Sequence, residues 1–249
     1  MIRLIVLRQH QKNNIMEFKK YISSIILAIA FVIGTDSVSD SIVKFKTLDR
    51  QITVKGLAEK EVPADKVTWP LQYKEMGNDP AEMYLTLEKK NKIVLDFLKQ
   101  GGIKDDEISI NPPTITDRQA NDYASMESPF RYKAISTITV TSKDVDKVRR
   151  LLNKQGELIR QGVPVSNGDY GQGVVYDFTG LNDIKPSMIE EATKNAKATA
   201  KKFASDSDSE IGKISNASQG QFTIEDRDST TPYIKKVRIV VTIKYFLKD

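Results

Sequence analysis

The sequence of 249 residues contains no cysteine and a single histidine. The absence of cysteine excludes disulfide bonds, a thiol nucleophile, thiolate metal sites and a lipid anchor built on an N-terminal cysteine. The one histidine, His10, comes before a stretch that is typical of an export signal. Histidine is the side chain whose ordinary pKa suits proton transfer near neutrality. If His10 lies outside the folded body, a histidine-based catalytic triad and a histidine-ligated metal are excluded as well.

The positive charge is concentrated near the N-terminus. The formal net charge of the chain is +5, and residues 1–34 hold five cationic side chains and one acidic side chain. These residues therefore account for +4, which leaves +1 for the rest of the chain. A nearly neutral body does not favour nucleic-acid binding, and its lysine clusters fall on predicted polar helix faces or at a strand start. We expect no nucleic-acid partner.

The N-terminal region is organised like an export signal. From Met16, a short cationic stretch precedes the mostly apolar residues 22–34, and a polar run follows. A helix of this length spans about 20 Å, less than the roughly 30 Å hydrocarbon core, which favours a cleaved signal peptide. No clear cleavage motif follows, so an uncleaved inner-membrane anchor formed by residues 21–34 is the alternative.

This organisation predicts three segments. They are a leader over residues 1–41, a linker over 42–49 and an exported body over 50–249, and translation can start at Met1 or at Met16. The body is expected in the periplasm or cell envelope, with membrane contact only through the N-terminal segment.

Hydrophobic periodicity within the body predicts an α+β fold. Asp79 before Pro80 marks the start of a helix that ends at Gly101-Gly102, with one apolar stripe formed by Met83, Leu87, Val94 and Leu98. Ser187 with Glu190 marks the start of another helix that runs to about Ala204, with a face of small residues at Ala192, Ala196 and Ala200. A third helix is expected over 144–160, with Val145, Val148, Leu152 and Ile159 on its apolar side. Strands are expected at 50–56, 62–73, 108–117, 132–141, 173–179, 213–225 and 233–246.

The two halves of the body repeat one pattern. Residues 114–118 (TITDR) match residues 223–227 (TIEDR), and after a shorter loop residues 128–130 (SPF) match residues 231–233 (TPY). We interpret this match as an internal duplication of a helix–strand–strand unit, with copies at about 50–142 and 143–249. It predicts antiparallel strands with helices packed on one face. Chance similarity between hairpins is the alternative.

No motif identifies a catalytic, cofactor-binding or metal-ligating residue, so we expect no cofactor, no metal and no enzyme. The candidate contact residues are the repeated pairs Asp117-Arg118 and Asp226-Arg227. They form either two equivalent contact loops or local ion pairs at strand ends, and the second interpretation is favoured. A carboxylate-dependent hydrolase is the weakest alternative, because nothing singles out two of the 33 acidic residues as a pair.

Two stretches of the body resemble the SIMPL-domain family of exported or envelope-anchored bacterial proteins. One is residues 52–56 (ITVKG) followed by 61–67 (EVPADKV), and the other is residues 188–204 leading to the predicted strand at 211–214. The resemblance covers about residues 50–248. It implies an α+β fold, an envelope location and homo-oligomers, with links to envelope or oxidative stress, and it provides no catalytic residues.

Together these features predict an exported, non-enzymatic envelope protein. It is expected to act by homo-oligomeric assembly or by binding an unidentified envelope protein. The alternative is a periplasmic binding module that holds a small molecule or peptide between the two repeats.

Overall fold

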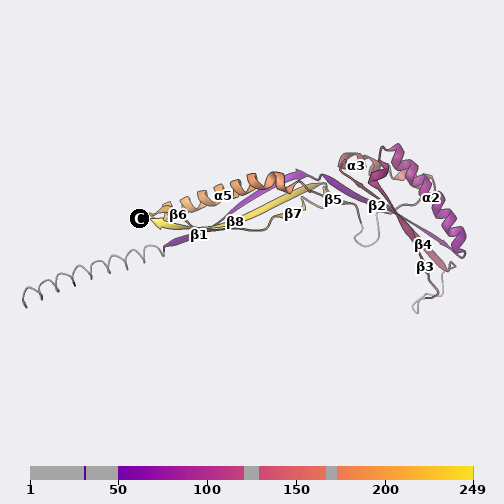
Figure 1. The fold of residues 1–249 in the computed structure, drawn as a ribbon, viewed down its shortest axis with the longest axis horizontal. Helices are drawn as coiled ribbons and strands as arrows, with labels where there is room; N and C mark the ends of the chain where they lie inside the picture. Colours follow the sequence, from indigo (N-terminus) through magenta and orange to yellow (C-terminus); the bar gives the residue numbers. More distant parts are fainter. Residues whose placement is uncertain (1–30, 32–49, 121–128, 167–172, 249) are drawn as a thin grey trace, which may run out of the picture. The chain divides into compact units, whose positions relative to one another are not determined.

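The computed structural model describes residues 31, 50–120, 129–166 and 173–248. Its two antiparallel sheets and their helices confirm the α+β prediction (Figure 1). Apart from Phe31, the predicted leader and the whole of the predicted linker lie outside the described residues. In chain order the elements are β1 (Gln51–Pro63), β2 (Lys66–Gly77), α2 (Pro80–Gln100), the 3-10 helix η1 (Asp105–Glu107), β3 (Ile108–Asp117), β4 (Tyr132–Ser142), α3 (Val145–Asn153), α4 (Gly156–Arg160), β5 (Val175–Asp177), α5 (Leu181–Asp206), β6 (Glu210–Gln219), β7 (Thr223–Asp226) and β8 (Ile234–Lys248).

The described residues form two compact units. The larger unit comprises residues 57–193 and 219–240 and contains α2, α3, α4 and a sheet with the strand order β3-β4-β2-β5. The smaller unit comprises described residues up to Gly56, residues 194–218 and the chain after Val240. It contains most of β6 and the adjoining ends of β1 and β8. These three strands form the second sheet, in the order β1-β8-β6, and β7 also pairs with β8.

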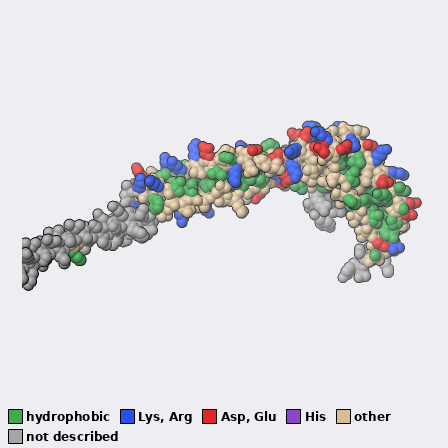
Figure 2. Space-filling model, in the orientation of Figure 1, with side chains coloured by type: hydrophobic (Ala, Val, Ile, Leu, Met, Phe, Trp, Pro, Cys, Tyr) green, Lys and Arg blue, Asp and Glu red, His purple; other side chains and the backbone are tan. Residues whose placement is uncertain are grey.

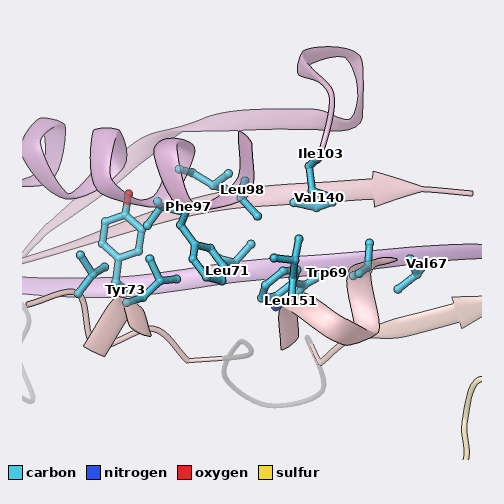
Figure 3. Close-up of a cluster of buried hydrophobic side chains, with 14 of the residues drawn as sticks. Val67, Trp69, Leu71, Tyr73, Phe97, Leu98, Ile103, Val140 and Leu151 are labelled. Carbon is cyan, nitrogen blue, oxygen red and sulfur yellow. The ribbon is translucent and has the colours of Figure 1, made fainter. Parts of the chain in front are cut away.

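The core of the larger unit lies between α2 and the central strands β2 and β4. Side chains alternate along a strand, so Val67, Trp69, Leu71 and Tyr73 share one face of β2, and all four are buried. Figure 3 shows them gathered with side chains from α2, β4 and α3. The predicted stripe of α2 is buried here, as expected from its helical spacing; its members are Met83, Leu87, Val94 and Leu98.

Both predicted ends of α2 are confirmed. The Asp79 carboxylate accepts hydrogen bonds from the backbone N–H groups of Ala81 (2.8 Å) and Glu82 (3.3 Å), and Pro80 occupies the first helical position. The helix ends at Gly101, and Gly102 has a φ of 81°, which suits glycine. All of these determinants lie next to the helix in the sequence.

The single helix predicted over residues 144–160 is wrong, because the chain forms α3 and α4 with a break between them. The N–H groups of Lys154 and Gln155 donate to carbonyls three residues earlier, which tightens the last turn of α3, and Gly156 follows. The break rotates the buried face. Leu158 is therefore buried, whereas Ile159, expected on the apolar side, is 57% exposed.

The predicted start of the next helix at Ser187 is also wrong. α5 begins at Leu181 and contains Pro186, and the Ser187 hydroxyl donates to the Ile184 carbonyl at 2.8 Å instead of capping the helix. The predicted alanine face is confirmed, since Ala192, Ala196 and Ala200 are fully buried. The second half of α5 and the end of β8 lie in the smaller unit, where α5 runs along β8 (Figure 1), and both contribute buried side chains.

The strand predicted over residues 213–225 is divided into β6 and β7. Gly220 donates its N–H to the Val240 carbonyl at 2.9 Å, and a Cβ at this position would lie 2.7 Å from that oxygen. A close backbone approach therefore interrupts the strand, and pairing with β8 resumes at Thr223. The predicted strand over residues 173–179 is reduced to the three residues of β5.

The strand register supports the proposed duplication. Asp117 pairs with Tyr132 and Asp226 with Lys235, the positions that the two matched segments make equivalent. The register of β3 shifts between Asn111 and Thr114, and the interruption between β6 and β7 falls at the same place in the second copy. The repeat boundaries stay a prediction, and β1, from the first predicted repeat, belongs to the sheet of β8.

The turn between β1 and β2 ties together segments that are distant in the sequence. The Asp65 carboxylate accepts hydrogen bonds from the N–H groups of Thr179 (2.8 Å) and Gly180 (2.9 Å), immediately before α5. The Asp65 N–H donates to the backbone carbonyl of Asp177, and the Ala64 N–H donates to the backbone carbonyl of Tyr233, both at 2.9 Å. A negative charge beside the N-terminus of a helix is also favourable. Asp65 therefore fixes where α5 begins.

We expect Asp65→Ala to lower the free energy of unfolding by about 2 kcal/mol, because two backbone N–H groups lose a charged acceptor. Chemical denaturation followed by circular dichroism measures this change. Asp106→Ala, at an exposed position in η1, is the matched control and should change stability by less than about 0.5 kcal/mol. Equal stability of the two variants would contradict the role assigned to Asp65.

Candidate functional site

The first candidate pair, Asp117-Arg118, lies at the end of β3. The Asp117 carboxylate accepts hydrogen bonds from Arg131 Nε (3.0 Å) and Nη2 (2.8 Å), and from the Gln119 N–H (3.0 Å). The hydrogen bonds from Arg131 hold the pKa of Asp117 below its ordinary value. The Arg118 N–H donates to the Arg131 carbonyl at 2.9 Å. The pair closes the β3–β4 hairpin.

The second pair, Asp226-Arg227, lies at the end of β7 in the other sheet. Asp226 forms an ion pair with Lys235, which is only 8% exposed. Arg227 donates to Asp228 (3.0 Å) and to the Thr231 hydroxyl (2.9 Å). Hydrogen bonds from Thr230, Thr231 and Arg227 hold the pKa of Asp228 well below its ordinary value. This pair organises the turn into β8.

Both aspartates are thus held by cations at strand ends, as the favoured interpretation expects. Their partners are not equivalent in the two copies. Arg131 corresponds to Ile234, and Lys235 corresponds to Tyr132, so each copy has its own ion pair. A contact role for these loops stays a prediction.

A polar groove lies on the face of the β1–β8 sheet where Lys236 and Arg238 point. Glu59 of β1 forms ion pairs with Lys236 (3.1 Å) and Arg238 (3.5 Å). On the other side of β8, Glu225 stands opposite Lys236 and Thr223 opposite Arg238. The cavity measures about 340 Å³. Two cations and two carboxylates in alternation suit a ligand that carries both charges.

This groove was not predicted from the sequence. Glu59 and the two cations come from strands that are about 180 positions apart in the sequence, so no local motif contains them. The alternating pattern of β8 is the one available signal. It places Lys236 and Arg238 on the same face, opposite the buried Val237 and Ile239.

A second groove, of about 490 Å³, lies between α2 and the irregular part of β3. Tyr84 and Ile110 border it and are about half exposed, and Pro112 and Pro113 form its far side. At its inner side, Asn91 accepts a hydrogen bond from the Ser136 hydroxyl at 3.0 Å. The groove combines apolar and polar side chains and carries one carboxylate, Glu88.

Comparison with known families identifies the chain. The family model described as "SIMPL: Protein of unknown function (DUF541)" matches residues 52–245. The chain belongs to the SIMPL family. No curated protein matches the sequence significantly. Membership supports an envelope-type domain whose function is uncharacterised.

The face of the SIMPL body that Figure 2 shows carries both kinds of charge. In Figure 2, cationic and acidic side chains are interspersed over the visible face. Among the described residues, no group of three or more acidic or histidine side chains is placed to hold a metal ion. Within the same residues, no helix has the length and apolar character needed to cross a bilayer.

We expect Arg131→Met to raise the pKa of Asp117 towards the ordinary value of about 3.9, because the charged donor is removed. Carboxyl ¹³C NMR titration measures this pKa directly. Since the folded-state pKa lies below the unfolded value, the ion pair contributes stability above about pH 4 and loses it as the pH falls through the folded-state pKa. A pKa of Asp117 that is the same with and without Arg131 would contradict this assignment.

Proposed function

We propose that this SIMPL protein is exported to the cell envelope and acts without catalysis, by assembling with copies of itself or binding another envelope protein. The open edge strand β6 carries the proposal. β6 has ten residues, and all seven from Lys213 to Gln219 are exposed. An edge strand presents backbone N–H and C=O groups that can pair with another chain. The link to envelope or oxidative stress rests on the family resemblance alone.

The other edges of the described sheets are protected against such pairing. β3 carries Pro112 and Pro113, which lack N–H donors, at a register shift. β5 and β7 have only three and four residues. β1 carries charged side chains along its length: Lys55, Glu59, Lys60 and Glu61. β6 combines length, exposure and few charges, and proline is absent from it.

The charged candidates support binding over catalysis. Asp117, Asp226 and Arg227 are engaged in ion pairs that hold turns. In the polar groove, Glu59 and Glu225 lie on either side of β8 with Lys236 between them. Paired carboxylates for general acid–base chemistry need to face one another across a substrate.

We expect the full chain, expressed in bacteria, to fractionate with the envelope and to sediment at no less than twice the mass of one mature chain, which is 28.0 kDa if the leader is retained. Cell fractionation and sedimentation velocity of the extracted protein measure both properties. N-terminal sequencing of the same material distinguishes a cleaved leader from a retained anchor. A cytoplasmic location would contradict export, and a strict monomer that captures no envelope protein would contradict the assembly or binding role.

The polar groove favours a second candidate function, the binding of a zwitterionic small molecule or short peptide. Glu59 comes from the first predicted repeat and Lys236 and Arg238 from the second, as the binding-module alternative requires. We expect unblocked dipeptides at millimolar concentration to raise the Tm by about 1–2 °C. Arg238→Gln should abolish this shift, whereas Lys213→Gln on β6 should not. A panel that leaves the Tm unchanged would contradict this function.

A further inference from the structure

The charges of β6 are confined to its first four residues. Glu210 and Lys213 are charged, whereas residues 214–219 (ISNASQ) are uncharged. Ile214, close to the middle of the strand, is 51% exposed. An exposed isoleucine beside uncharged polar residues lacks the charged side chains that usually prevent strand pairing.

This distribution makes β6 complementary to a second copy of itself in one orientation. If two β6 strands lie antiparallel about a two-fold axis, one residue faces its own copy, because hydrogen-bonded and non-hydrogen-bonded pairs alternate along the ladder. With Ser215 at that position, Lys213 faces Ala217 and Glu210 faces Gly220 of the other copy. No like charges then stand opposite each other. In a parallel pair with the same overlap, Glu210 faces Glu210 and Lys213 faces Lys213, which is unfavourable.

We propose that two copies of this chain join by antiparallel pairing of their β6 strands about a two-fold axis at Ser215, where the Ser215 residues of the two copies face each other. The proposal rests on the proposed function, because it names the partner and the surface used in assembly. Such a contact is isologous, so it uses the same surface on both chains and closes at a dimer. The pairing joins the two sheets edge to edge and brings Ile214 of each copy next to the axis.

Charge reversal at the axis tests the pairing. Ser215 is exposed, and in the dimer the two Ser215 residues face each other at the axis, with their side chains on the same face of the sheet. We expect Ser215→Lys alone and Ser215→Glu alone to weaken self-association of the full chain by about tenfold or more, because like charges meet. An equimolar mixture of the two variants should restore it. Sedimentation velocity measures the dimer fraction, and Ser109→Lys on the protected β3 edge is the control that should leave it unchanged.

A cross-linking experiment tests the register. The chain contains no cysteine, so introduced thiols have no competitors. Directly opposed residues of antiparallel strands have Cα atoms about 4.5–5.5 Å apart, within the range for a disulfide. We expect mild oxidation of a mixture of Lys213→Cys and Ala217→Cys chains to give a covalent dimer containing one chain of each kind.

The outcomes separate this inference from the proposed function. If the unaltered chain is a monomer, self-assembly fails together with the β6 pairing. If the unaltered chain assembles but Ser215→Lys assembles equally well, only the β6 pairing is overturned. Loss of assembly in both Ser215 variants without recovery on mixing also overturns it, because β6 then serves a different partner or the variants disturb the fold.

Discussion

The hydrogen bonds accepted by the Asp65 carboxylate fix the place where the chain passes from one sheet to the other. They hold Thr179 and Gly180, so α5 starts at Leu181 and places its alanine face correctly. The neighbouring bond from Ala64 to Tyr233 ties the start of β8 to the same turn. Asp65 belongs to residues 61–67, one of the stretches by which the sequence resembles SIMPL proteins. That stretch therefore has a structural role here.

Elements with local determinants were predictable, and elements with distant ones were not. α2 has its cap, its proline and its terminal glycines within its own neighbourhood, and both ends agree with the prediction. α5 starts several residues before Ser187, at a place organised by the Asp65 carboxylate. Because Asp65 is about 115 residues away in the sequence, no pattern near the helix predicts that start. The break between β6 and β7 depends on Val240, which approaches Gly220 from another strand. No periodicity of residues 213–225 contains that information.

The candidate site shows the same division. The ion-pair interpretation of Asp117 and Asp226 followed from their places at strand ends, and the structure supplies cations at both. The identity of those cations was not predictable, because Arg131 and Lys235 occupy different positions in the two copies. The polar groove of Glu59 depends on the pairing of distant strands within one sheet, so the alternation within β8 was its one signal in the sequence.

The two copies have diverged at the strand edge that our proposal uses. Residues 114–117 and 223–226 pair in the same register, and the irregularity before them falls at Pro112-Pro113 in one copy and at Gln221-Phe222 in the other. Before that point the likeness ends. At the same spacing, residues 210–216 of β6 correspond to residues 101–107, where the first copy has a glycine turn and η1. β3 and β6 both have ten residues, but the edge of the first copy is interrupted by two prolines, whereas β6 contains none. The fold needs only the part of the hairpin that both copies share. Residues 210–216 of β6 are therefore the part most available for a contact with another chain.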